Sequence, residues 1–131
     1  MDPRFLLDTH ILLRSLAEPG CLSRDQLRFI ERAAALNERI AISDVTLVEI
    51  AFLQAAGRLP NFELDDLARE TRPPVQILPI TLEIASEVRV LIRTLRVPAD
   101  CAIVATARVH GLRLLTSDRR IIESGLVSVI E

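Results

Sequence analysis

The stretch that decides the fold lies near the amino end of the chain and reads Phe5-Leu6-Leu7-Asp8-Thr9-His10-Ile11-Leu12-Leu13. It opens with a short apolar run, which is typical of a buried strand. Asp8 then stands where a helix begins, because an aspartate accepts hydrogen bonds from the free N–H groups of a first helical turn. The stretch therefore predicts a strand over Arg4–Asp8 that is followed directly by a helix over Thr9–Ala17.

The same alternation of short apolar runs and amphipathic segments continues along the chain. Further strands are expected at Arg39–Ser43, Val75–Leu78, Leu112–Thr116 and Val127–Ile130. Further helices are expected from Ser23 to about Glu38, from Ser43 or Asp44 through Ala56, and at Glu63–Thr71, Thr81–Leu95, Pro98–His110 and Arg119–Ser124. Strands separated by helices imply parallel pairing. The sequence predicts one α/β domain over residues 1–131, a three-layer α/β/α sandwich with a mostly parallel central sheet.

Composition narrows the class of protein. The chain has 131 residues, of which 50% are apolar, so a packed core is available. No apolar stretch approaches the length of a membrane span, and the first residues lack the pattern of a signal peptide. Cys21 and Cys101 are too few for a disulfide scaffold and lack partners at the spacing of metal ligands. We expect reduced thiols, a cytoplasmic location and no membrane association.

The basic residues are unusual because all 16 are arginine and none is lysine. Phosphate-binding loops of the Walker type and Schiff-base enzymes need a lysine, and both are therefore excluded. Phosphatases that use an aspartate nucleophile are disfavoured for the same reason. The net charge is −2, with 18 acidic residues. If four of these acids belong to one metal site, the remaining surface is mildly basic.

Four acids stand at the ends of predicted elements or near helix starts: Asp8, Glu49, Asp100 and Asp118. Carboxylates this close to buried segments are costly unless they are paired or bind a cation. In parallel sheets a ligand site lies beyond the carboxyl ends of the strands, where two of these acids are expected. Carboxylate oxygens suit Mg2+ or Mn2+. Hydroxyls that could support such a site follow nearby, at Thr9, Thr116 and Ser117.

Each acid also has a simpler interpretation. Asp8 and Asp118 could cap the helices that follow them. Asp100 could be an ordinary acid in a first helical turn. Glu49 is harder to explain in this way, because its neighbours along the chain, from Leu47 to Ala51, are apolar. The set of four is more informative than any one member.

Four segments resemble the motifs of PIN-domain ribonucleases, and specifically of the VapC-type toxins of bacterial toxin–antitoxin pairs. They are Leu6–Leu13, Ser43–Ile50, Pro98–Ala107 and Leu114–Asp118. The resemblance extends from Leu6 to the final strand. The chain departs from many relatives at Val97, where they carry a further acid, and at Cys101, where they carry an arginine.

The resemblance implies a catalytic and metal-binding role for Asp8, Glu49, Asp100 and Asp118. These residues would hold Mg2+ or Mn2+, and a metal-bound water would attack the RNA phosphate. His10 could contact the substrate or the metal's surroundings, although a plain helix-start side chain is the favoured interpretation. The resemblance also implies a cognate VapB-like antitoxin and a homodimer.

Phosphate binding would depend on arginine, because the chain has four Phe but neither Trp nor Tyr for base stacking. Arg14 and the pair Arg119-Arg120 are the best candidates. A stripe of arginines at helical spacing, Arg89, Arg93 and Arg96, fits a solvated face better. Two other functions stay open: a housekeeping RNA-processing PIN nuclease without an antitoxin, and a non-catalytic module that binds RNA or protein.

Overall fold

The centre of the molecule is a parallel β-sheet, seen in a computed structural model that describes residues 2–59, 67 and 74–131. Within these residues five strands pair in the order β3-β2-β1-β4-β5, and every neighbouring pair is parallel. The strands are β1 (Phe5–Leu7), β2 (Ile40–Ser43), β3 (Val75–Leu78), β4 (Arg113–Leu115) and β5 (Val129–Ile130). The run that opens the chain is thus the central strand, and all three of its residues are buried.

Helices join the strands, and most begin at a side chain that caps them. They are α1 (Thr9–Ala17), the short 3-10 helix η1 (Pro19–Cys21), α2 (Arg24–Ala35), α3 (Asp44–Ala55), α5 (Leu82–Leu95), α6 (Pro98–His110) and α7 (Arg119–Ser124). Ser23 Oγ, for example, accepts the backbone N–H of Gln26 at 3.1 Å and starts α2. These elements confirm the predicted order, with ends shifted by a few residues. The helix predicted at Glu63–Thr71 lies almost wholly outside the described residues.

The second helix, α2, differs from its prediction in its length. It ends at Ala35 and does not reach Glu38, because Asn37 adopts a left-handed backbone with φ of 52°. The N–H of Glu38 bonds back to the carbonyl of Ala33 at 2.8 Å, which closes the helix. The buried residues of this helix are Gln26, Ile30 and Ala33.

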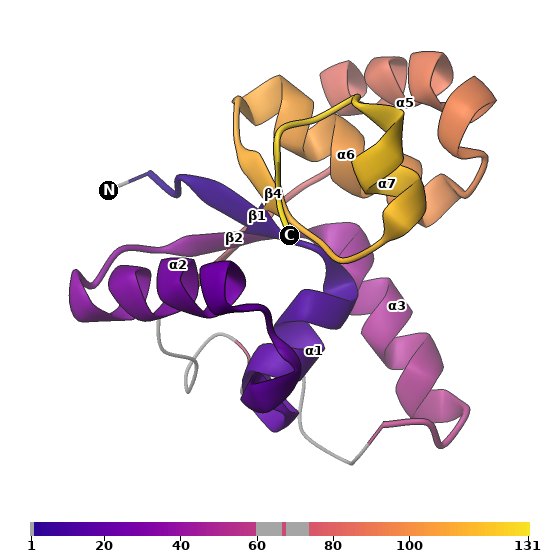
Figure 1. Ribbon diagram of the computed structural model, residues 1–131. Coiled ribbons are helices and arrows are strands. Elements are labelled where there is room, and N and C mark those ends of the chain that lie inside the picture. Colours follow the sequence, from indigo (N-terminus) through magenta and orange to yellow (C-terminus); the bar gives the residue numbers. More distant parts are fainter. Residues whose placement is uncertain (1, 60–66, 68–73) are drawn as a thin grey trace.

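Two apolar cores lie on opposite faces of the sheet, as a three-layer sandwich requires. Side chains of β1 alternate between them: Phe5 and Leu7 face one core, and Leu6 faces the other. Figure 1 shows α1 and α2 on one side of the sheet and α5, α6 and α7 on the other. In the described parts of the chain, no helix is long and apolar enough to cross a membrane.

The strand order creates one special position at the carboxyl edge of the sheet. The chain moves outward from β1 through β2 to β3, and then returns to place β4 on the other side of β1. β1 and β4 are therefore neighbours whose connections leave in opposite directions, which is where parallel sheets place their ligand sites. Asp8 follows β1, and the segment Thr116–Asp118 follows β4.

Candidate functional site

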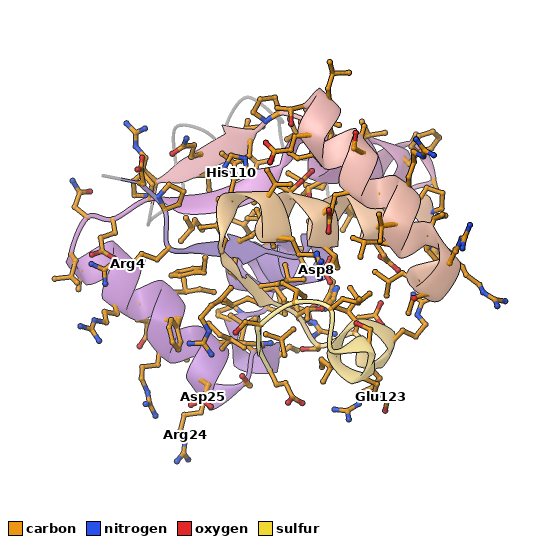
Figure 2. All side chains as sticks on the ribbon, turned by 90° about the horizontal axis from the view of Figure 1, so that it is seen from above. Arg4, Asp8, Arg24, Asp25, His110 and Glu123 are labelled. Carbon is orange, nitrogen blue, oxygen red and sulfur yellow. The ribbon has the colours of Figure 1, made fainter. Side chains whose placement is uncertain are left out.

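Asp8 lies at this switch point and is only 4% exposed. Its Oδ1 accepts the backbone N–H of Thr9 at 2.8 Å, which caps α1. Its Oδ2 accepts the hydroxyl of Thr116 at 2.7 Å, from the end of β4. Figure 2 shows Asp8 near the middle of the molecule. The capping interpretation and the site interpretation of Asp8 are therefore compatible, because each uses a different oxygen.

Glu49 joins Asp8 through the side chain of Thr9. The Thr9 hydroxyl donates to Glu49 Oε1 at 2.6 Å. The hydroxyl of Thr46 lies 2.9 Å from Thr9 Oγ1, and it supplies the second hydrogen bond because the Thr9 proton is already donated. The neighbours of Glu49 along the chain are apolar, but they do not all lie beside its side chain, since Val48 is 52% exposed and Glu49 itself is half-buried. Residues that are adjacent in a helix point in different directions.

Asp118 and Asp100 are joined by the guanidinium of Arg120. Nη2 of Arg120 donates to Asp118 Oδ2 and to Asp100 Oδ2, in both cases at 3.1 Å. The backbone N–H of Arg120 also donates to Asp118 Oδ1 at 2.9 Å, so that Asp118 caps α7. The backbone N–H of Asp118 in turn donates to the Thr116 hydroxyl at 3.1 Å. One continuous chain of hydrogen bonds thus connects all four predicted acids.

The ionisation of Asp100 reflects this crowding of carboxylates. Burial is the main cause that raises its pKa to about 6, and the charges of Asp8, Asp118 and Glu49 raise it further against the opposing charge of Arg120. Burial also acts to raise the pKa of Asp118, but hydrogen bonds from Arg120 outweigh it and hold that pKa below its usual value. The four carboxylates therefore lie near enough to one another for their charges to interact.

His10, in the first turn of α1, contacts both Asp8 and the segment between β4 and α7. Nδ1 of His10 lies 3.4 Å from Asp8 Oδ2. Nε2 of the same ring accepts the backbone N–H of Ser117 at 3.2 Å. His10 is therefore more than a helix-start side chain, because its ring links Asp8 to the loop that carries Asp118.

Gln26 is a supporting residue that the sequence did not reveal. Its side chain is fully buried, and Nε2 lies within hydrogen-bond distance of Thr116 O, Ser117 Oγ and Ile130 O, at 3.2, 3.2 and 3.3 Å. Its Oε1 accepts the N–H of Ser23 at 3.1 Å and completes a capping box. The spacing Ser23-x-x-Gln26 was the available signal, but it indicates a helix start and not a contact with β4.

Two arginines expected near the acids point elsewhere. Arg119 pairs with Glu131 at 3.1 Å and with Glu123 at 3.7 Å, and Figure 2 shows Glu123 at the margin of the molecule. Arg14 stands in the last turn of α1 and makes no ion pair with the four carboxylates in the described parts of the chain. Of the three candidate arginines, Arg120 is the one that reaches the acids.

The donor set suits a hard divalent cation. Carboxylate and hydroxyl oxygens surround the site, and neither thiolate pairs nor clustered imidazoles compete with them. In their present positions, no three Asp, Glu, His or Cys side chains of the described residues converge closely enough to enclose a metal ion. Arg120 supplies the positive charge between Asp100 and Asp118, and it acts as a stand-in for a cation at that place.

Comparison with known proteins relates most of the chain to one family. Residues 5–125 match the PIN domain. Ribonuclease VapC22 of Mycobacterium tuberculosis (strain ATCC 25618 / H37Rv) is 31% identical over 118 residues, which cover 88% of either chain.

Solved structures share the fold. FitAcB from Neisseria gonorrhoeae matches with a TM-score of 0.70 and 20% identity, and a toxin-antitoxin complex from Klebsiella pneumoniae matches with 0.67 and 22%. Each match covers 97% of this chain and 96% of the other. The resemblance that the four motifs indicated is confirmed, and the chain belongs to the PIN-domain family.

Proposed function

We propose that this protein is a metal-dependent endoribonuclease whose catalytic residues are Asp8, Glu49, Asp100 and Asp118. The observation that carries the proposal is the continuous hydrogen-bonded chain that connects these carboxylates at the edge between β1 and β4. The carboxylates come from four separate parts of the fold. A helix cap needs only one local carboxylate, whereas a ligand site gathers several. RNA as the substrate is supported by the identity to a relative named as a ribonuclease.

The proposed cofactor is Mg2+ or Mn2+, held by the four carboxylates. When bound, such an ion would activate a water molecule and neutralise the charge that develops on the phosphate. The residues of the chain fix the ligands in place. The hydroxyls of Thr9 and Thr116 orient Glu49 and Asp8, and the ring of His10 braces Asp8 from the side. This chemistry needs no nucleophile from the protein.

Cleavage by the purified protein tests the catalytic proposal. With Mg2+ or Mn2+ and an RNA substrate, we expect Asp8→Asn to lower the cleavage rate at least about 100-fold, since loss of a ligand exceeds the usual effect of a supporting residue. Asp25→Asn is a matched control, because Asp25 is exposed and its one ion pair within the described residues is with Arg28. Equal cleavage by Asp8→Asn and the parent would contradict catalysis by these carboxylates.

We further propose that the protein is the toxin of a VapBC-type pair, with a VapB-like antitoxin as its partner and a homodimer as its assembly. The toxin role and the antitoxin are supported by the identity to Ribonuclease VapC22 and by a similar solved structure that is described as a toxin-antitoxin complex. The homodimer is an expectation from the family resemblance. A further similar structure is VapBC2 from Rickettsia felis bound to a DNA fragment from the promoter, with a TM-score of 0.64 and 17% identity over 96% of both chains.

Induced expression of the chain alone tests the toxin proposal. We expect growth arrest with the parent chain and normal growth with Asp8→Asn, and we expect co-expression of the neighbouring small reading frame to restore growth. Normal growth with the parent, combined with RNA cleavage in vitro, would favour a housekeeping nuclease. Sedimentation of the purified protein tests the homodimer separately.

A further inference from the structure

Arg120 occupies the half of the site formed by Asp100 and Asp118. Its Nη2 lies 3.1 Å from an oxygen of each carboxylate, and its Nε lies 3.4 Å from Asp118 Oδ1. The other half of the site differs, because Asp8 and Glu49 accept hydrogen bonds from the uncharged hydroxyls of Thr116 and Thr9. A guanidinium thus holds Asp100 and Asp118, whereas hydroxyls hold Glu49 and Asp8, with the ring of His10 also 3.4 Å from Asp8 Oδ2.

We propose that Arg120 is a built-in counter-cation that competes with the divalent metal for Asp100 and Asp118, so that metal binding releases its guanidinium from the site. This inference rests on the proposed metal-dependent function. It assigns to Arg120 a role in controlling metal occupancy, and not the role of a ligand.

Charge and geometry prevent the Arg120 guanidinium and a divalent ion from occupying the site at the same time. The guanidinium contacts Oδ2 of both Asp100 and Asp118, so an ion bound between the two carboxylates competes with it for these oxygens. A divalent ion and a guanidinium a few ångströms apart repel each other strongly, and the repulsion is greater where the surroundings exclude water. A metal that takes these oxygens must therefore displace the side chain of Arg120.

The surroundings of Arg120 allow this displacement at little structural cost. Its side chain is 63% exposed, so solvent can receive the guanidinium when it leaves. Asp118 Oδ1 caps α7 by accepting the backbone N–H of Arg120 at 2.9 Å, and this bond does not involve the Arg120 side chain. Asp118 therefore keeps its orientation when the guanidinium departs, and the ligand stays in position for the metal.

The test is the affinity of the metal-free protein for Mn2+, measured by titration calorimetry on the full chain. We expect Arg120→Gln to bind Mn2+ about three- to tenfold more tightly than the parent, a range set by the modest strength of exposed ion pairs. Arg119→Gln is the matched control. It removes the same charge from the adjacent position, but Arg119 pairs with Glu123 and Glu131. We expect less than about a twofold change for this control.

A second measurement uses the unaltered chain, so it holds even if the Arg120 variant fails to fold. In NMR spectra of the parent, the Nε–H signal of Arg120 should shift and lose protection as Mg2+ is added, while that of Arg119 stays constant. An unmoved Arg120 signal at saturating Mg2+ would overturn the inference. So would an Arg120→Gln affinity that is unchanged, weaker, or raised only as much as in Arg119→Gln.

Asp8→Asn separates this inference from the proposed function. If the parent binds Mn2+ and Asp8→Asn does not, the proposed metal site is supported independently of Arg120. An Arg120 side chain that does not respond to the metal then overturns only the proposed competition. If neither the parent nor Arg120→Gln binds Mn2+, both proposals fall. Binding by Arg120→Gln in the absence of detectable binding by the parent would support the competition most directly.

Discussion

Asp8 and Asp118 each perform two tasks with different atoms. In each residue, Oδ1 accepts a backbone N–H at the start of the following helix. The second oxygen faces the site, where Asp8 Oδ2 meets Thr116 and Asp118 Oδ2 meets Arg120. The sequence left open whether these residues cap helices or belong to the site. They do both, since a carboxylate has enough acceptor positions for the two roles.

Asp100 makes the metal-free protein sensitive to pH. Its pKa is about 6 in the folded chain, against an ordinary value of 3.8. Ionisation of Asp100 is therefore harder in the folded chain than in the unfolded one. The protonated Asp100 carboxyl contributes stability that is fully present below pH 4 and is lost as the pH rises through 6. We expect Asp100→Asn to stabilise the metal-free protein at pH 7.5, on the order of 1 kcal/mol after allowance for solvent screening.

Urea unfolding at pH 4.5 and pH 7.5 measures this difference. The gain from Asp100→Asn should be larger at the higher pH, and Asp25→Asn serves as the exposed control. A variant that is less stable than the parent at pH 7.5 would show that Asp100 is held by favourable contacts and not strained by its neighbours.

The second helix supports the site although it carries none of the four acids. Gln26 ties the start of α2 to the ends of β4 and β5. Gln26→Leu removes these bonds and leaves buried carbonyls with fewer partners, so we expect a loss of about 2 kcal/mol in the free energy of unfolding. Cleavage should fall as well, because the loop at Ser117 loses its hydrogen bond from Gln26.

Ser23→Ala is the control for this prediction. It removes the cap of α2, which costs about 1 kcal/mol, together with the hydrogen bond from Ser23 Oγ to the carbonyl of Glu131, and leaves the contacts of Gln26 with the strands in place. If Ser23→Ala slows cleavage as much as Gln26→Leu does, general destabilisation of α2 explains both effects, and a specific role for Gln26 is wrong.

The order of elements could be predicted from sequence, whereas the direction of single side chains could not. Short apolar runs and capping residues such as Ser23 and Thr81 determine where elements begin, and these signals are local. Successive residues of a helix point about 100° apart, so the choice between Arg119 and Arg120 depends on how α7 packs. That packing is set by Ile121, which is fully buried in the core shared with α5 and α6.

Metal binding should stabilise the whole molecule, because the ligands come from elements far apart in the sequence. A ligand at 100 times its dissociation constant adds about 2.7 kcal/mol to the free energy of unfolding. For a chain of this length we expect Mn2+ to raise Tm by about 5–10 °C at pH 7.5. The rise should be smaller near pH 5, where Asp100 is largely protonated. An equal rise in Asp8→Asn would point to a metal site elsewhere.

The overall charge predicts a shallow salt dependence of RNA binding. The net charge is −2, and of the three candidate arginines only Arg120 reaches the acids. Each phosphate contact with a single strand contributes a slope of about −0.7 in log affinity against log salt. We expect a slope of roughly −0.7 to −1.4, from one or two such contacts, for the non-cleaving Asp8→Asn variant. A slope steeper than about −4 would show that further arginines, such as Arg89 and Arg93, also bind the strand.

The place of β4 beside β1 has a consequence during protein synthesis. Asp8 meets Thr116 across 108 positions of sequence, and Arg120 lies further along still. Because ribosomes add about 5–20 residues per second, Asp8 waits several seconds for its neighbours to emerge. The four carboxylates cannot assemble in that interval. On the proposed function, a nascent chain would therefore be harmless to the message that encodes it, and it would acquire its reactive centre only when its last strands are available to fold.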